Sequence, residues 1–207
     1  MRTHLLILSI LFCVGANAQI IKGSTLFGGS VNFSHADNAN GTAFYASVQY
    51  AKAYKDNNFF GLQVGYGHYH HINQNWNFYN GGIFYRKYLP IVKSLYLFGE
   101  GNFNLGYSRL YSISSNPQSE TIDNNYNATI SLMPGLSYAV NSKLQLEIAF
   151  PNIASLYYGH HVYKNTTSGV SFTTHDSNYG LNSSSQLNTF SNIQFGFRFL
   201  FQKRKAK

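Results

Sequence analysis

The chain has 207 residues, of which 17% are aromatic and only 11% are charged, and its formal net charge is +8. The positive charges are spread along the chain apart from the terminal KRKAK, so a nucleic-acid-binding face is not expected. Its one cysteine, Cys13, lies in the N-terminal segment described next, which excludes disulfide bonds and thiol chemistry from the rest.

The N-terminal segment MRTHLLILSILFCVGANA has the layout of a secretory signal peptide. Arg2 supplies a short basic region, residues 5–14 form an apolar core, and Ala16-Asn17-Ala18 is a small-residue cleavage site. We therefore predict that residues 1–18 are cleaved. The remainder is long enough for one domain, residues 19–201, followed by a basic tail, residues 202–207. Beyond residue 18 no apolar run approaches the ~18 residues that a spanning helix needs.

The mature chain alternates apolar and polar residues over most of its length. In LYLFGEGNFNLGY, residues 95–107, one parity carries Leu95, Leu97, Phe103 and Leu105, and the other carries charge and amides. Successive side chains of a strand point to opposite faces, so this period predicts long two-faced strands. Eight strands are predicted, at about 22–34, 42–50, 58–70, 76–89, 94–112, 125–140, 143–163 and 186–201.

The lengths of the strands and loops favour a membrane barrel. Strands of ten or more residues with aromatic residues near the ends of the apolar face are typical of outer-membrane proteins. The connections 51–57, 90–93 and 141–142 are short and alternate with 35–41, 71–75, 113–124 and 164–185, two of which are long. We predict an all-β fold, an eight-stranded antiparallel up-and-down transmembrane β-barrel with both termini in the periplasm. The alternative is a soluble lipocalin-like barrel with its apolar faces turned inward, which the many aromatic residues would overfill.

Several segments resemble a known family. KGSTLFGGSVNFS, YRKYLP followed by LYLFGEGNFNLGYS, LMPGLSYAVNSKLQLEIAF and the closing FGFRF are similar to the small outer-membrane β-barrel family of Bacteroidetes-type bacteria. The resemblance runs from about Lys22 to Phe201. It implies a porin-like barrel of eight strands in the bacterial outer membrane, and it implies no particular activity.

Four charged residues have the parity of the barrel interior. They are Arg86, Glu100, Glu147 and Arg198, and each is expected a few residues from the periplasmic end of its strand. Because eight strands leave room only for side chains, these charges are expected to form a neutral hydrogen-bonded network that fills the lumen. Two alternatives remain: a gate whose ion pairs exchange to pass small ions, and a proton-transfer pair.

A second candidate site is HDSNYG, residues 175–180, which fits the pattern H-x-S-N-x-G. It resembles the catalytic stretch of the lipid A deacylase family, which would make His175 the general base and Ser177 the nucleophile. A serine hydroxyl needs such an adjacent base. The segment GVSFTTHDSNYGLNSSS around it is predicted to be a loop.

Histidines gather at the predicted extracellular end. His68, His70 and His71 stand in GYGHYHH, and His160 and His161 form a second pair. His68 and His70 share the outward parity, whereas His71 falls on the inward one. We predict a rim that contacts lipopolysaccharide phosphate or water. A zinc or copper site assembled across the mouth is the alternative, because neutral imidazoles suit both metals.

Together these features predict a non-enzymatic outer-membrane barrel with a side-chain-filled lumen and at most minor permeability to small ions. Its expected partners are outer-membrane lipids, lipopolysaccharide and the barrel-assembly machinery. No cofactor and no resident metal are expected, and the sequence names no extracellular ligand.

Overall fold

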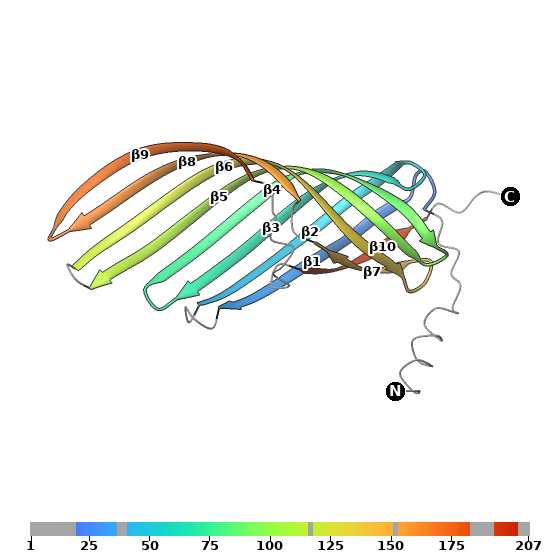
Figure 1. Cartoon of the computed structure of the whole chain (residues 1–207), viewed down its shortest axis with the longest axis horizontal. Helices are drawn as coiled ribbons and strands as arrows, with labels where there is room; N and C mark the ends of the chain where they lie inside the picture. The colour runs from blue at the N-terminus through green and yellow to red at the C-terminus, as the bar shows by residue number, and fades with distance from the viewer. Residues whose placement is uncertain (1–19, 37–40, 116–117, 151–152, 183–192, 203–207) are drawn as a thin grey trace, which may run out of the picture.

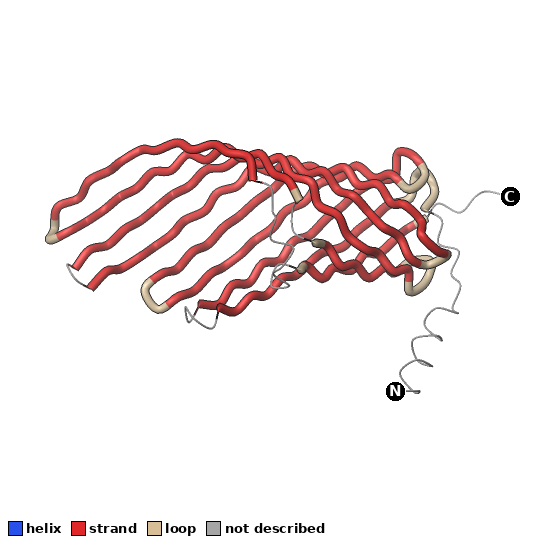
Figure 2. The backbone as a smooth tube through the Cα atoms, viewed as in Figure 1, coloured by secondary structure: helices blue, strands red, loops and turns tan. Residues whose placement is uncertain are grey.

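The computed structural model describes residues 20–36, 41–115, 118–150, 153–182 and 193–202. The predicted signal peptide and the tail beyond Gln202 lie outside these residues. Strands make up nearly all of the described chain, joined by short turns (Figure 2). Among the described residues, no helix is long and apolar enough to cross a membrane. The ten strands are β1 (Thr25–Ala36), β2 (Gly41–Lys55), β3 (Asn58–His71), β4 (Gln74–Val92), β5 (Leu95–Ser115), β6 (Gln118–Ala139), β7 (Leu144–Ala149), β8 (Ala154–Thr167), β9 (Val170–Asn182) and β10 (Gln194–Phe201).

Eight of the strands close into a hydrogen-bonded ring. The strand order around the ring is β1, β2, β3, β4, β5, β6, β7 and β10. The ring closes where Thr25–Val31 of β1 pair with Phe195–Phe201 of β10. Every pairing is antiparallel. We call the end of the ring where β1 begins and β10 ends the closed end (Figure 1). The predicted all-β antiparallel fold is therefore confirmed.

At the other end, which we call the flared end, the sheet continues past the ring. Above its pairing with β7, β6 pairs with β8 from Ser119 to Leu132, and β8 pairs with β9 along its whole length. The long strands β4, β5, β6, β8 and β9 spread outward as a curved sheet (Figure 1). The flared end is thus a trough that leads into the ring.

The structure corrects several predicted boundaries. β2 continues to Lys55, so most of the connection expected at 51–57 is strand. The strand expected at 143–163 is divided into β7, which ends at Ala149, and β8, which begins at Ala154. Most of the expected connection 113–124 belongs to the ends of β5 and β6, which pair as far as Ser115 and Gln118. The expected loop 164–185 contains β9. Ser168 and Gly169 have positive φ angles of 51° and 82°. Two such residues form the tight turn that joins the strands of a hairpin, here β8 and β9.

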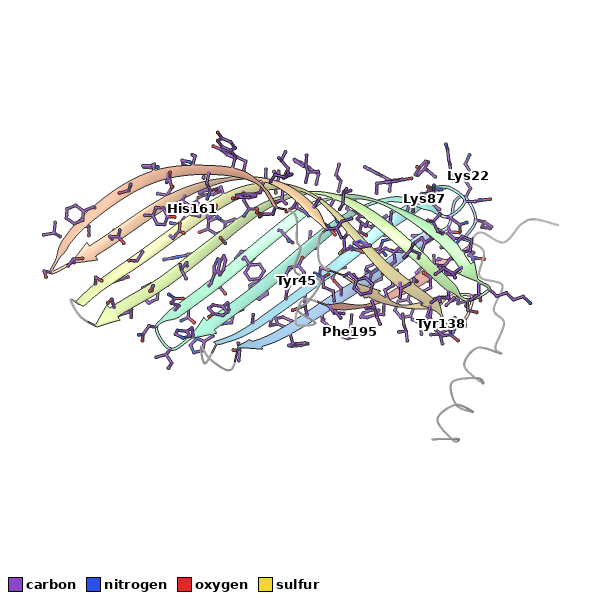
Figure 3. All side chains as sticks on the ribbon, in the orientation of Figure 1. Lys22, Tyr45, Lys87, Tyr138, His161 and Phe195 are labelled. Atoms are coloured by element: carbon purple, nitrogen blue, oxygen red, sulfur yellow. The ribbon has the colours of Figure 1, made fainter. Side chains whose placement is uncertain are left out.

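The outer face of the ring is apolar and exposed. Leu62, Val64, Leu105 and Phe195 are 58–61% exposed. Phe195 points away from the sheet in Figure 3. The apolar parity therefore faces outward, as the membrane-barrel prediction requires and contrary to the lipocalin-like alternative.

The inner face carries the core, which sits at the closed end. Side chains crowd the space between the strands there (Figure 3). The core combines small aliphatic residues with aromatic rings, including Leu26, Phe59, Tyr88, Phe98 and Leu200, none more than 1% exposed. Tyr88 shares the parity of Arg86, and Phe98 shares that of Glu100, so the alternation of their strands turns both rings inward.

Candidate functional site

Four charged side chains lie inside the ring near its closed end. Arg86 is on β4, Glu100 on β5, Glu147 on β7 and Arg198 on β10, and none is more than 3% exposed. Each falls on the inner parity of its strand, so the alternation of the strand turns it inward. These are the four residues that the sequence analysis selected, and the structure brings them together.

Glu147 connects the two arginines of this charge cluster. Its carboxylate oxygens accept hydrogen bonds from Arg86 Nη1 at 2.8 and 2.9 Å. Arg198 Nη2 lies 3.1 Å from Glu147 Oε2. Arg86 also pairs with Glu100, its direct cross-strand partner, and its Nε donates to Glu100 Oε2 at 2.5 Å. Two positive and two negative charges thus form one connected, electrically neutral cluster.

Aromatic side chains surround the Arg86 guanidinium. Its central carbon lies 4.5 Å from the centroid of the Phe98 ring, within the range of a cation–π contact. The Tyr88 hydroxyl donates to Glu147 Oε1 at 2.6 Å and accepts from Arg86 Nη1 at 3.0 Å. Phe59 and Tyr88 pack in a T-shaped arrangement, with ring centroids 5.9 Å apart. Such buried charges are tolerated only because their partners compensate for the lost water.

A chain of carboxamides leads from the charge cluster toward the flared end. Arg86 Nη2 donates to Gln49 Oε1 at 3.1 Å, and Gln49 Nε2 donates to Gln63 Oε1 at 2.9 Å. Gln63 Nε2 then donates to Asn104 Oδ1 at 2.7 Å and to Asn102 Oδ1 at 3.1 Å. The alternation already gave Asn102 and Asn104 the inward parity of Glu100, but it could not show that Gln49 and Gln63 join them to Arg86.

The carboxamides line a cavity, which we call the luminal cup. It has a volume of about 390 Å³. Glu100, Glu147 and Arg198 of the charge cluster also line it, and the rest of its wall is uncharged and mainly polar or aromatic, with Met133, Ala149 and Gly196 among it. Two buried atoms of the cluster, Glu100 Oε1 and Arg198 Nε, have no hydrogen-bond partner. The cup is therefore a polar recess with unused hydrogen-bonding capacity at one end.

His68 and His70 lie on one face of β3. The rings of His68 and His70 stack with centroids 6.5 Å apart. Each pairs with an asparagine of β4, His68 Nδ1 lying 2.9 Å from Asn77 Oδ1 and His70 Nδ1 lying 2.6 Å from Asn75 Oδ1. His71 ends β3 on the opposite parity.

The second histidine pair lies on β8, which β4, β5 and β6 separate from β3. His161, on the flared sheet (Figure 3), has its Nδ1 3.1 Å from Asp123 Oδ2. His160 is on the opposite face. Within the described residues, no group of three or more histidine, cysteine or acidic side chains is arranged to hold a metal ion.

His175 and Ser177 lie on β9 rather than on a loop. Ser177 faces His160 directly in the β8–β9 register, and its Oγ is 2.9 Å from His160 Nδ1. His175 stacks on His160, with ring centroids 5.9 Å apart. The imidazole beside the Ser177 hydroxyl is therefore that of His160. Asp176 has the opposite parity, and its carboxylate accepts the Ser177 backbone N–H at 2.8 Å.

No family model matches the chain. No curated protein matches it either. The solved structures that resemble it include the following three. Neisserial surface protein A (NspA) is 12% identical with a TM-score of 0.45, and the match covers 87% of this chain and 98% of that one. The outer membrane protein OprG from Pseudomonas aeruginosa is 10% identical with a TM-score of 0.46, covering 89% and 98%. The translocator domain of the autotransporter NalP from Neisseria meningitidis is 11% identical with a TM-score of 0.39, covering 96% and 92%. Likenesses this low do not assign the chain to a family or transfer a function to it.

Proposed function

We propose that this chain is a non-enzymatic integral protein of the bacterial outer membrane, a β-barrel whose lumen is closed by the charge cluster. The observation that carries the proposal is the exposed apolar outer face of a closed ring. Leu62 is 59% exposed, Val64 61% and Leu105 58%. Contiguous apolar surface of this kind is unfavourable in water and favourable against lipid tails. A ring that pairs its own backbone groups has no edge that lipid would leave unsatisfied.

The outer face also has the expected boundaries of a membrane span. Tyr66, Tyr79, Tyr107 and Tyr126 are cross-strand partners on four successive strands. Two residues further toward the flared end, the outward positions on these strands become His68, Asn77, Arg109 and Asn124. Tyrosines at the border between an apolar band and polar surface are typical of membrane barrels.

Exposed lysines mark the other boundary, at the closed end. Tyr79 and Lys87 of β4 both have the outward parity and lie eight positions apart. This separation is ~26 Å along the strand and ~20 Å along the bilayer normal at the usual strand tilt. Lys22 lies at the same end (Figure 3). The lysines exposed at this end are Lys22, Lys52, Lys55, Lys87, Lys93 and Lys143.

These two boundaries and the predicted signal peptide support one orientation of the barrel in the membrane. The closed end, where β1 begins, β10 ends and the lysines are exposed, faces the periplasm, where basic side chains contact anionic phospholipid headgroups. The flared end and its histidines face the lipopolysaccharide outside. The barrel-assembly machinery inserts the exported chain.

The charge cluster and the aromatic core beneath it occupy the lumen, which supports a structural and surface-interaction role. An ion gate, in which these ion pairs exchange to pass small ions, is the alternative to this closed lumen.

Fractionation tests the proposal. Membranes from expressing cells are separated on a sucrose gradient, washed with alkaline carbonate, and run on gels with and without boiling. The protein should remain in the outer-membrane fraction and migrate faster when unheated, because a closed barrel resists detergent unfolding. A soluble protein with unchanged migration would contradict the proposal and favour the lipocalin-like alternative.

A second candidate function is lipid A modification by a deacylase-like esterase. It is supported by the 2.9 Å contact of Ser177 Oγ with His160 Nδ1 on the outer face, next to His175. A hydroxyl so placed can lose its proton to the imidazole as it attacks an ester. Lipid A mass spectra from cells with and without the protein decide between the two functions. An unchanged number of acyl chains rules out the esterase.

A further inference from the structure

We propose that the luminal cup binds a small neutral polyol, of the size of a mono- or disaccharide. The inference rests on the proposed function, because it takes the charge cluster as the closed floor of a cup that opens toward the flared end. The outer wall of the barrel indicates no ligand, whereas the lining of the cup indicates a class of ligand.

The floor of the cup has an acceptor that the protein leaves unused. Glu100 is 2% exposed and lines the cup. Its Oε2 binds Arg86, whereas its Oε1 is buried without a hydrogen-bond partner. A buried carboxylate oxygen in this state is unfavourable until a donor reaches it. A ligand hydroxyl in the cup is such a donor.

The wall offers donors in return. Asn102 and Asn104 use their Oδ1 atoms to accept from Gln63. Within the described part of the chain, neither amide nitrogen donates a hydrogen bond to another residue. Both asparagines line the cup. A hydroxyl group is both donor and acceptor, so a ligand with several hydroxyls can satisfy the carboxylate and the amides together.

The charges favour a neutral ligand. The floor already balances two arginines with two glutamates. The rest of the lining carries no charged side chain. A charged ligand would bring an uncompensated charge into a buried neutral network, and this carries a large desolvation penalty.

One side of the cup is aromatic. The rings of Tyr45 and Phe78 stack with centroids 5.9 Å apart, and both residues line the cup. Such rings offer a flat apolar surface for the C–H face of a sugar ring. Phe78 also borders a recess of about 410 Å³ that includes Trp76, and the Trp76 and Phe78 rings are 5.8 Å apart. Trp76 is the only tryptophan of the chain and therefore reports on the mouth of the cup.

The experiment is a titration of the mature full-length protein in lauryldimethylamine oxide micelles, because alkyl-glycoside detergents carry sugars themselves. Glucose, N-acetylglucosamine and maltose are the polyol probes, and ethanolamine is the cationic probe. Trp76 fluorescence and isothermal calorimetry are both recorded. At least one sugar should saturate the signal with a half-point on the order of 1–10 mM, as expected for a ligand with few atoms. Ethanolamine should not.

Asn104→Leu keeps the side-chain volume and removes the amide, so it should weaken sugar binding by about tenfold. Asn165→Leu is the matched control at an exposed position on β8 and should bind as the wild type does. The heat-dependent gel shift confirms that each variant forms the barrel. Failure of that shift would count against the proposed function rather than against the cup.

Three results would overturn the proposal for a folded protein. They are no saturable signal with any sugar by either method, saturation by ethanolamine without saturation by sugar, and wild-type sugar binding by Asn104→Leu.

Discussion

Replacing Glu147 by glutamine tests the charge cluster most sharply. Glu147 is 3% exposed and lies between two arginines. Its oxygens are 2.8 and 2.9 Å from Arg86 Nη1 and 3.1 Å from Arg198 Nη2, and the Tyr88 hydroxyl lies at 2.6 Å. Glu147→Gln preserves the shape but leaves two buried guanidinium groups with the single carboxylate of Glu100.

Breaking a buried ion pair by removing one partner costs about 3–5 kcal/mol. The amide N–H₂ of glutamine would replace a carboxylate oxygen and face the hydrogen-bond donors that this oxygen accepted from. The glutamine side chain therefore does not compensate for the lost charge. With a urea dependence of about 2 kcal/mol/M, the unfolding midpoint should fall by ~2 M. The double variant Glu147→Met with Arg198→Met removes one charge of each sign and leaves Arg86 paired with Glu100. It should be less destabilised than Glu147→Gln, although it loses more hydrogen bonds.

The free energy of unfolding is measured by urea titration of the protein in phospholipid vesicles, followed by tryptophan fluorescence and by the gel shift. Glu120→Gln is the control, because Glu120 is an exposed carboxylate on β6. Its effect should stay within about 0.5 kcal/mol. A Glu147→Gln protein within about 1 kcal/mol of the wild type would refute the claim that these charges depend on one another.

Three further predictions follow from the outer and inner faces. Gly135→Val should abolish the heat-dependent gel shift, because a Cβ there would lie 2.2 Å from the Phe98 ring and 2.7 Å from a backbone oxygen of β7. Gly99→Val is the control and should fold normally, because a Cβ at Gly99 has nothing within 4 Å. Equal yields of folded barrel from the two variants would contradict the packing. Added zinc should leave the melting temperature unchanged, and a rise that disappears in His160→Ala would instead indicate a rim metal site. Ser177→Ala should leave the lipid A acyl number as in the wild type, and any difference would favour the esterase.

The alternation of residues predicted much of this structure because a strand's period is a local property. It placed Leu62 and Val64 outside, and it placed Arg86 and Glu100 inside on adjacent strands, where they are direct partners. It also separated His71 from His68 and His70.

Other features depend on contacts that the period does not encode. The strand β9 is rich in serine, threonine and asparagine, which are common in loops, and its pairing with β8 overrides that preference. The resemblance to the lipid A deacylase motif implied that His175 is the base for Ser177, whereas the β8–β9 pairing places the His160 imidazole beside the Ser177 hydroxyl. The link from Glu147 to both arginines joins β7 to β4 and β10, and only ring closure makes these strands share one interior.

Single-channel recording in planar lipid bilayers tests the central claim, a barrel closed by its charge cluster, most directly. The purified wild-type protein should insert and give no discrete conductance steps, because the charge cluster and the aromatic core fill the ring. Regular openings of the wild type, lost in a folded Arg86→Ala variant, would contradict the closed lumen and establish an ion gate in its place.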